Sequence, residues 1–446
     1  MTKGNEISLL LKFTLPLLVG NIFQQFYNMV DSIVVGKYVN SNALGAVGSV
    51  GAINFLFFSL CFGLSSGIGI LISQYFGAGK KEMVKKIIAN SIYITLISGI
   101  VMSFVGVFLS KPILILMNTP KETFAYAHTY MIICNSAIFL VAAYNMVSSI
   151  LRALGDSRTP LIFLVVACLT NIVLDLLFVV VFKLGVTGVA LATVIAQVVA
   201  MIGSIIYGYR KNEYLHIEKR HLKFDREIFK KSFKIGIPLA AQNSLIAFSC
   251  MALQSVVNHY GATVMAAYTA TGRVEQLVQQ PFSSLGAAVS TFAGQNAGAG
   301  KMNRVKSGCK KSLLLVLGFG IFMIAIMFLF GESVIGIFVN EPEVIKMGST
   351  GLKITSLMYT PLGAIYIMRG MLNGVGDTTF TMMNGVAEVV GRVGFALLFM
   401  MIPGIGVWGI WYTNGLTWII TALMNTFRFV QGKWKKKALV GRVKAA

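Results

Sequence analysis

QYFGAGKKEMVKK at residues 74–86 has a second copy, QNAGAGKMNRVKS, at residues 295–307. This repeat offset, which places Gly79 on Gly300, recurs in two further pairs: LRALGDSRT at 151–159 with LNGVGDTTF at 372–380, and GVTGVALAT at 185–193 with GVWGIWYTN at 406–414. Composition alone does not produce three motifs at one offset. The chain is therefore predicted to be a tandem duplication of one structural unit.

The composition predicts that both copies lie in a lipid bilayer. Of the 446 residues, 56% are hydrophobic and only 12% are charged, whereas soluble proteins carry about 25% charged residues. The net charge of +22 could indicate a nucleic-acid-binding protein. The basic residues, however, sit in short loops between apolar runs, without the interleaved aromatic residues of single-strand binders. An integral membrane protein is expected.

Apolar runs and their breaks predict twelve transmembrane helices, several of them longer than the roughly 20 residues needed to cross a bilayer. The predicted spans are 10–36, 44–76, 87–109, 124–152, 160–182, 187–209, 232–258, 264–294, 312–331, 346–373, 379–401 and 406–430. The first apolar stretch runs on to about residue 35, so it is interpreted as a retained span and not as a signal peptide.

A polar segment at 209–231 divides the chain nearly in half. We expect an N-terminal six-helix lobe at 1–208, a linker at 209–231, and a C-terminal six-helix lobe with a basic tail at 232–446. An even number of spans per copy gives both lobes the same orientation, related by a pseudo-two-fold axis along the membrane normal.

The distribution of basic residues predicts which side of the membrane the loops occupy. Most Lys and Arg residues fall on the side of the termini, the linker and the two GAGK loops. Only Lys37, Lys111, Lys121, Lys183, Lys346 and Lys353 fall on the opposite side. Under the positive-inside rule, the termini and the linker are cytoplasmic.

Several motifs have simpler explanations than catalysis. GAGK lacks the Ser or Thr and the strand-to-helix context of a phosphate-binding loop, so it is interpreted as a tight turn. The Gly-Asp pairs at 155–156 and 376–377 are predicted turns whose aspartates can cap the next helix. The five cysteines show no pairing or metal-ligand spacing, and no histidine cluster is present. No metal, cofactor or enzymatic activity is expected.

The most informative residues are acids inside the apolar spans. A carboxylate at bilayer depth costs roughly 2.5–3.5 kcal/mol on insertion scales. Asp31 shares a helical face with Gln24 and with Tyr27 or Asn28. Asn171 and Asp175, four residues apart, point the same way from the fifth span. Such polar faces must line a bundle interior or an aqueous cavity.

The duplication indicates that these acids are functional and do not merely stabilise the packing of the helices. Under the repeat offset, Asp31 falls on Ala252 and Asp175 on Ala396. Helix packing would need the same acids in both copies. An asymmetric pair of carboxylates instead indicates a site for a cation or a proton.

Four other ionisable residues lie within the predicted spans: Arg273, Glu275, Glu388 and Arg392. Glu388 and Arg392 have the four-residue spacing of an intrahelical ion pair, and a structural role is favoured over substrate contact. Arg273 and Glu275 are two residues apart and cannot share a helical face, so their function stays open. All four are candidates for a central cavity or for substrate contact.

Over essentially its whole length, the chain resembles the multidrug and toxic compound extrusion (MATE) transporters, and within them the DinF-like and bacterial multidrug-export branches. The resemblance rests on the tandem repeat and on the loops ending in Gly77-Ala78-Gly79 and running from Gln295 to Gly300. It implies an all-α fold of twelve transmembrane helices in two six-helix lobes that form a V.

The resemblance also implies a cation site in the N-terminal lobe. The family's Asp on helix 1, Asn and Asp on helix 5, and Thr on helix 6 fall on Asp31, Asn171, Asp175 and Thr193. Gln24 and Tyr27 match polar residues that precede the helix 1 aspartate. Pro16 matches a proline implicated in bending that helix.

One branch of the family departs from this sequence. The NorM-like branch places acids on helices 7 and 10 for a sodium site in the C-terminal lobe. Here the corresponding stretches, IPLAAQNSLIAFS at 237–249 and PLGAIYIMRGML at 361–372, contain no acid. A C-terminal sodium site of that kind is not expected.

The residues and the resemblance together predict a secondary antiporter that exports amphipathic organic cations in exchange for H⁺ or Na⁺. We expect a multi-pass, monomeric protein of a bacterial cell membrane, without nucleic-acid partners. A lipid-linked precursor flippase of the same superfamily is the nearest alternative, although it would need a basic cavity. A membrane-embedded enzyme would need a nucleophile, base or metal constellation that the sequence does not show.

Overall fold

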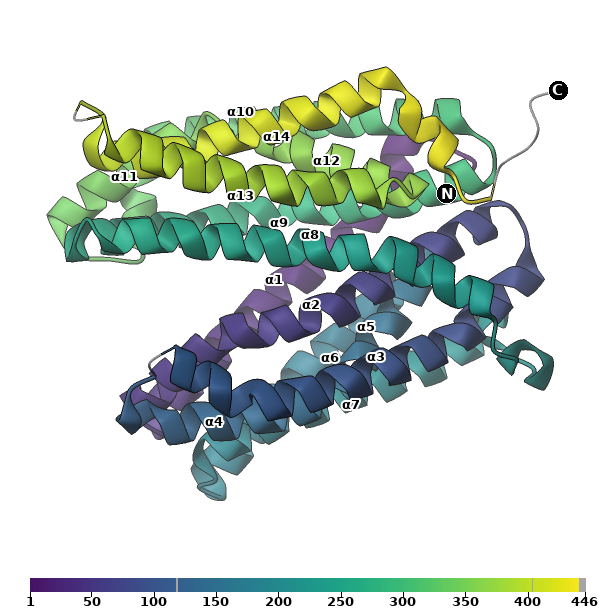
Figure 1. Ribbon diagram of the computed structural model, residues 1–446, viewed down its shortest axis with the longest axis horizontal. Coiled ribbons are helices and arrows are strands. Elements are labelled where there is room, and N and C mark those ends of the chain that lie inside the picture. The colour runs from purple at the N-terminus through teal and green to yellow at the C-terminus, as the bar shows by residue number, and fades with distance from the viewer. Residues whose placement is uncertain (118, 403, 441–446) are drawn as a thin grey trace. The chain divides into compact units, whose positions relative to one another are not determined.

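Helices account for the fold of the described residues, which contain no strand. The structure is a computed structural model that describes residues 1–117, 119–402 and 404–440. The helices of the first half are α1 Glu6–Tyr38, α2 Ser41–Gly77, α3 Lys81–Leu116, α4 Lys121–Ser136, α5 Ile138–Ala153, α6 Arg158–Asp175 and α7 Gly185–Lys211. Those of the second half are α8 Arg226–Asn258, α9 Ala262–Gly298, α10 Met302–Gly336, α11 Pro342–Ser356, α12 Tyr359–Val375, α13 Thr378–Met400 and α14 Gly409–Gln431 (Figure 1).

These helices coincide with the twelve predicted spans, of which two are broken. Among the described residues, eight helices are long and apolar enough to cross a membrane, or nine when α4 and α5, bent by 50°, count as one span. The remaining predicted spans correspond to α9, to the α11–α12 pair and to α14. The break between α4 and α5 falls at Ala137, and the break between α11 and α12 falls at Leu357 and Met358. The repeat offset places Ala137 on Met358, so both copies interrupt the same span.

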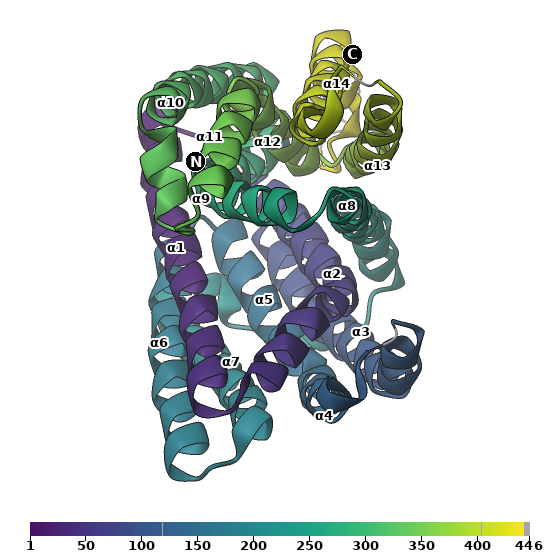
Figure 2. The ribbon, with the colours of Figure 1, turned by 90° about the vertical axis from the view of Figure 1, so that its left-hand side faces the viewer.

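The chain forms two compact units. Unit 1 contains Met1–Thr14 and Ala241–Ala446, and unit 2 contains Leu15–Ala240. In unit 1, α9 packs along α12, and α13 and α14 lie side by side (Figures 1 and 2). In unit 2, α6 packs along α7, and α2 packs on α3, α4 and α5.

Both boundaries between the units fall within a helix and close to a proline. The chain passes from unit 1 to unit 2 after Thr14 and returns after Ala240, and Pro16 and Pro238 lie inside α1 and α8. A proline within a helix removes one backbone hydrogen bond and favours a kink. Each half therefore starts with a helix whose backbone is weakened at the point where it changes unit.

The two GAGK motifs are turns, as the sequence predicts. Gly79 and Gly300 have φ values of +70° and +73°, which side chains other than glycine rarely adopt. Gly79 ends the turn from α2 to α3, and Gly300 ends the turn from α9 to α10. The left-handed backbone explains why both copies place a glycine directly before the lysine.

Basic residues after each turn bind the chain segment that precedes the first helix of a half. In unit 1, the Met1 ammonium donates to Gln295 Oε1 at 2.7 Å, Arg304 donates to the Gly4 carbonyl at 2.6 Å, and Lys311 pairs with Glu6. We call these three contacts the N-terminal clasp. It shows that basic residues of the second motif hold the start of α1.

Unit 2 contains the corresponding linker clasp. Lys81 pairs with Glu213 at 2.7 Å and Lys86 with Asp225 at 2.6 Å. Asn90 Oδ1 accepts from the Asp225 backbone N–H at 2.8 Å. The first motif therefore holds the segment that leads into α8.

The two Gly-Asp turns differ in the role of the aspartate. Asp156 accepts from the backbone N–H groups of Arg158 and Thr159 at 3.0 Å, so it caps α6 as predicted. Asp377 makes no capping bond to α13. Its carboxylate pairs instead with Arg428 Nε of α14 at 2.8 Å. The predicted capping role is therefore wrong for Asp377, because an arginine from a distant helix binds its carboxylate.

Replacing Asp225 with alanine is expected to reduce the free energy of unfolding by about 1 kcal/mol, the usual effect of losing a helix N-cap. Asp225 caps α8 through the backbone N–H groups of Glu227 and Ile228 and also binds Lys86. Thermal unfolding of the purified protein in detergent measures the loss. Glu343→Ala, at an exposed position in α11, is the control and should change little.

The effect of Asp225→Ala should depend on pH. The hydrogen bond from Lys86 is the main cause that lowers the pKa of Asp225, followed by the backbone bond from Ile228. Its contribution is therefore complete above the unfolded-state pKa of about 4 and is lost as pH falls through the folded-state value. A difference between wild type and variant that grows on acidification would contradict this assignment.

Candidate functional site

Three helices of unit 2 bring together the four residues predicted to form a cation site. Asp31 lies on α1, Asn171 and Asp175 on α6, and Thr193 on α7. Asn171 and Asp175 are fully buried, and Asp31 is 8% exposed. Acids so far from water need a partner that compensates their charge.

Hydrogen bonds connect Thr193 to the other two helices. The Tyr27 hydroxyl of α1 donates to Thr193 Oγ1 at 3.3 Å, and Thr193 Oγ1 donates to the Val189 carbonyl at 3.1 Å. With its amide nitrogen facing Asp175, Asn171 donates to Asp175 Oδ2 at 3.1 Å and accepts from the Thr193 backbone N–H at 3.3 Å. We assign this amide orientation because it satisfies both neighbours.

The Asp31 and Asp175 carboxyl groups lie within hydrogen-bonding reach of each other. Oδ1 of each has no hydrogen-bond partner among the described residues. Neither acid forms an ion pair with any described Lys, Arg or His. Two carboxylates in contact cannot both stay ionised without a bound cation. The arrangement therefore suits a proton shared by the pair or a monovalent cation with oxygen ligands.

A local change in helix type follows the second acid. Asp175 is the last residue of α6, and Leu176–Val181 (η1) continues as a π-helical turn. π-helical segments are rare and occur frequently at functional sites. The wider turn changes the angular position of the residues that follow Asp175.

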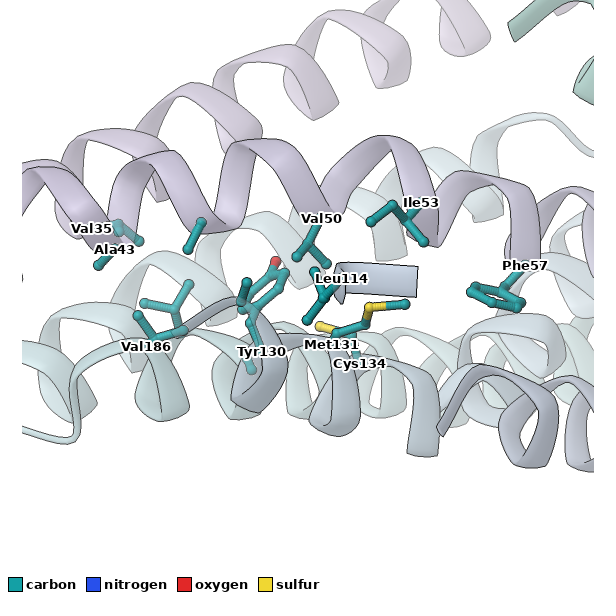
Figure 3. Close-up of a cluster of buried hydrophobic side chains, with 14 of the residues drawn as sticks. Val35, Ala43, Val50, Ile53, Phe57, Leu114, Tyr130, Met131, Cys134 and Val186 are labelled. Carbon is teal, nitrogen blue, oxygen red and sulfur yellow. The ribbon is translucent and has the colours of Figure 1, made fainter. Parts of the chain in front are cut away.

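An apolar cluster adjoins the carboxyl pair. It contains Val34 and Val35 of α1, Tyr130 and Cys134 of α4, and Val189 of α7. Figure 3 shows Tyr130, Met131 and Cys134 lying against side chains of α2. Buried apolar side chains lower the local dielectric constant, so charges close to this cluster are screened weakly.

The other residues predicted for the α1 face lie differently. Tyr27 joins the site through Thr193, whereas the side chains of Gln24 and Asn28 are exposed. Pro16 is part-buried and lies fifteen positions before Asp31 in the same helix. The structure thus brings Tyr27 to the carboxyl site, but not Gln24 or Asn28.

Unit 1 has a different polar centre at the corresponding positions. Under the repeat offset, Asn171 becomes Arg392 and Thr193 becomes Asn414. Arg392 Nε donates to Asn414 Oδ1 at 3.2 Å, and Asn414 Nδ2 donates to the Tyr268 hydroxyl at 3.3 Å. The contact between helices is kept, but a guanidinium replaces the carboxamide.

Glu388 completes this centre. Its Oε2 binds Arg392 Nη1 at 3.1 Å, which is the predicted intrahelical pair, and its Oε1 binds Arg369 Nη2 at 2.5 Å. Arg392 also donates to Ser249. We call Arg369, Glu388 and Arg392 the arginine–glutamate triad; in it the carboxylate has a partner on both oxygens.

Sequence reasoning missed Arg369. It lies in PLGAIYIMRGML, near the end of a predicted span, where a basic residue is easily assigned to the adjoining loop. Its part-buried side chain in α12 instead faces Glu388. The only available signal was that Glu388 could pair with two basic residues of the same half. This pairing can be recognised only when the neighbouring helices are known.

Arg273 and Glu275 differ in exposure, as expected for residues two positions apart on a helix. Arg273 is exposed, and Glu275 is 8% exposed. Glu275 forms no ion pair with a described basic residue, and its Oε1 has no hydrogen-bond partner there. The two residues therefore do not pair with each other.

Comparisons with known proteins agree with this architecture. A model of the MatE family matches residues 16–177 and again 238–398. The chain is 29% identical over 435 residues to the probable multidrug resistance protein YoeA of Bacillus subtilis, covering 96% of this chain and 94% of YoeA. It is 25% identical over 421 residues to the multidrug export protein MepA of Staphylococcus aureus, covering 92% and 90%. A crystal structure of MATE in the bent conformation superposes with a TM-score of 0.91 at 22% identity, covering 97% of each chain.

Removing the shared acid of the triad should destabilise unit 1. Glu388→Ala leaves the buried guanidinium of Arg392 and the part-buried guanidinium of Arg369 without their carboxylate, and breaking a buried ion pair in this way typically costs about 3–5 kcal/mol. The thermal midpoint of the detergent-purified protein should fall strongly, and less for Glu388→Gln. Glu332→Ala, on the exposed side of α10, is the control. Equal midpoints for Glu388→Ala and Glu332→Ala would show that the triad does not stabilise the fold.

Proposed function

The chain belongs to the MatE family, and from this premise we propose that it is a secondary antiporter that exports amphipathic organic cations in exchange for H⁺ or Na⁺. Its relatives are multidrug transporters, and its many apolar helices make it a multi-pass membrane protein. The observation that carries the proposal is the buried contact between Asp31 and Asp175, with no described basic partner.

In this proposal, Asp31 and Asp175 hold the coupling ion, and Asn171 and Thr193 orient them. Asn171 donates to Asp175, and its carbonyl accepts from the Thr193 backbone. A proton shared by the carboxyls would neutralise the site, and Na⁺ could instead bind the same oxygens. Either ion removes the repulsion that opposes two carboxylates in one apolar site.

The contrast between the units supports placing the coupling ion in unit 2. In unit 1, Glu388 has two arginine partners, so the triad needs no further cation. In unit 2, the two carboxyls have no described basic partner. The carboxyl pair of unit 2 therefore requires a cation from solution, whereas the triad of unit 1 does not.

Transport requires that ion binding at Asp31 changes the position of α1. Pro16 lies inside α1, next to the residue at which the chain passes from unit 1 to unit 2. The N-terminal clasp holds the start of α1 through Glu6. We infer that α1 moves about Pro16 when the carboxyl pair is neutralised and that a bound substrate is then released.

The available energy is sufficient for useful export. One elementary charge moving down 100 mV supplies about 2.3 kcal/mol, which corresponds to roughly a fifty-fold concentration ratio. A cationic substrate would compete with the coupling ion for the same negative charge. Aromatic and methionine side chains suit the flat apolar bodies of such compounds.

The competing flippase function is less well supported. A lipid-linked pyrophosphate would need free cationic groups, but both arginines of the triad are bound to Glu388.

Location, topology and oligomeric state are proposals as well. We propose a bacterial cell membrane, cytoplasmic termini by the positive-inside rule, and a monomeric state.

Asp31→Asn is expected to abolish gradient-driven transport while preserving the fold, because asparagine keeps the shape of the side chain and removes its charge. Everted vesicles with wild type or variant are loaded with ethidium under an imposed proton or sodium gradient. The wild type should transport under one gradient, which identifies the ion, and the variant should match vesicles without the protein.

The matched control is Asp156→Asn. Asp156 caps α6 outside the carboxyl site, and asparagine caps helices equally well, so this variant should transport like wild type. Full transport by folded Asp31→Asn would refute the coupling role.

A further inference from the structure

A short segment directly after α14 concentrates positive charge on the surface of unit 1. Its four lysines are all exposed: Lys433, Lys435, Lys436 and Lys437. We call them the lysine cluster. Residues 389–446 contain no Asp or Glu, and no lysine of the cluster forms an ion pair with any residue that the structure describes.

The lysine cluster differs in this respect from other basic residues of the same unit. Arg428, in the last turn of α14, pairs with Asp377 at 2.8 Å. In the N-terminal clasp, Lys311 pairs with Glu6. Like charges that are close together repel each other unless counter-charges lie near them. Since the described chain provides no such partner for the cluster, an anion from outside the protein suits it.

Trp434 holds this segment against the protein. Its side chain is 1% exposed, and its indole N–H donates to the Phe429 carbonyl at 3.0 Å. The two rings stack, with centroids 5.9 Å apart and an angle of 9° between their planes. Gly432, with φ of +71°, turns the chain out of α14, and Lys433–Lys437 form a 3₁₀-helix. One buried residue therefore fixes the backbone while the lysine side chains stay at the surface.

The apolar face of α14 places the lysine cluster at the level of the lipid headgroups. Leu423, Phe427 and Val430 follow one face of the helix and are 63%, 66% and 77% exposed. Large apolar side chains so exposed on a membrane helix face the acyl chains. Val430 lies three residues before Lys433, a rise of about 5 Å along a helix, which is comparable with the thickness of the headgroup layer.

This position and this chemistry favour an anionic lipid over a nucleic acid. Lysine clusters next to a membrane helix attract anionic lipids, and each lysine near the surface contributes about a fivefold factor in affinity. Proteins that bind single-stranded nucleic acids also present aromatic side chains on which bases stack. The only aromatic residue within 432–440 is Trp434, which is buried.

We propose that the lysine cluster, held in place by Trp434, is a docking surface for the phosphate headgroups of anionic phospholipids. A bound headgroup supplies the negative charge that the described chain lacks there, and it holds the end of α14 at the membrane surface. The surface belongs to unit 1 and contains no residue of the carboxyl site in unit 2. It is therefore independent of the proposed coupling by Asp31 and Asp175.

Native mass spectrometry of the full chain in detergent measures this binding. The protein is titrated with phosphatidylglycerol or with phosphatidylcholine, and the ratio of the two bound fractions at equal lipid concentration is the readout. Wild type should prefer phosphatidylglycerol, and the preference should weaken as salt is raised. Replacing all four lysines of the cluster with glutamine should lower the ratio by roughly tenfold or more. The fold should survive, because these side chains are exposed and Trp434 is kept.

Two matched variants test whether the location of the charges matters. Replacing the four lysines with arginine keeps the charge and should keep the preference. The control removes the same number of charges from exposed, unpaired lysines of unit 2, and it should keep most of the preference. Its changes are Lys219→Gln, Lys223→Gln, Lys230→Gln and Lys234→Gln.

Three results would overturn the proposal. The first is an unchanged ratio in the glutamine variant of the cluster, and the second is an equal loss in the control, which would show that binding follows net charge alone. The third is displacement of phosphatidylglycerol from wild type by an equal concentration of polyuridine RNA or of inorganic phosphate, which would assign the cluster to a soluble anion. The measurement needs no ion gradient, so its failure is distinct from failure of the proposed transport.

Discussion

A charge buried in an apolar helix bundle must be compensated by an opposite charge, a proton or a bound ion. Most features of this molecule follow from how each buried acid meets that requirement. Glu388 is compensated by Arg369 and Arg392. Asp31 and Asp175 have only each other and neutral neighbours. The first arrangement stabilises a fold, whereas the second creates a need for an exchangeable ion.

The duplication shows how one scaffold acquired these two solutions. Positions 171 and 193 contact each other in unit 2, and the corresponding positions 392 and 414 contact each other in unit 1. The helix contact is kept because both copies pack the same pair of helices. The chemistry differs, since an arginine occupies one copy and an asparagine the other. The divergence therefore affects charge, while the packing of the helices stays the same.

The loops after the second helix of each copy have the same turn and make corresponding contacts. Both contain the same glycine turn, and both bind the segment that precedes the first helix of a half. These helices, α1 and α8, are also those that contain a proline where the chain changes unit. Such helices are held firmly at one end and weakened farther along. This combination localises bending near the proline instead of distributing it along the helix.

The sequence by itself determined the all-α membrane fold, the duplication and the residues of the carboxyl site. Hydropathy, a constant offset and helical spacing are properties of the chain alone, so Asp31, Asn171 and Asp175 could be selected without coordinates, whereas Thr193 was selected through the resemblance to the MATE transporters. Only the tertiary structure decided that Arg369 pairs with Glu388, that Asp377 binds Arg428 and that Oε1 of Glu275 has no described hydrogen-bond partner. The physical reason is that a buried charge is compensated by whichever side chain a neighbouring helix presents. That neighbour can lie anywhere in the sequence, so only the packing of the helices identifies it.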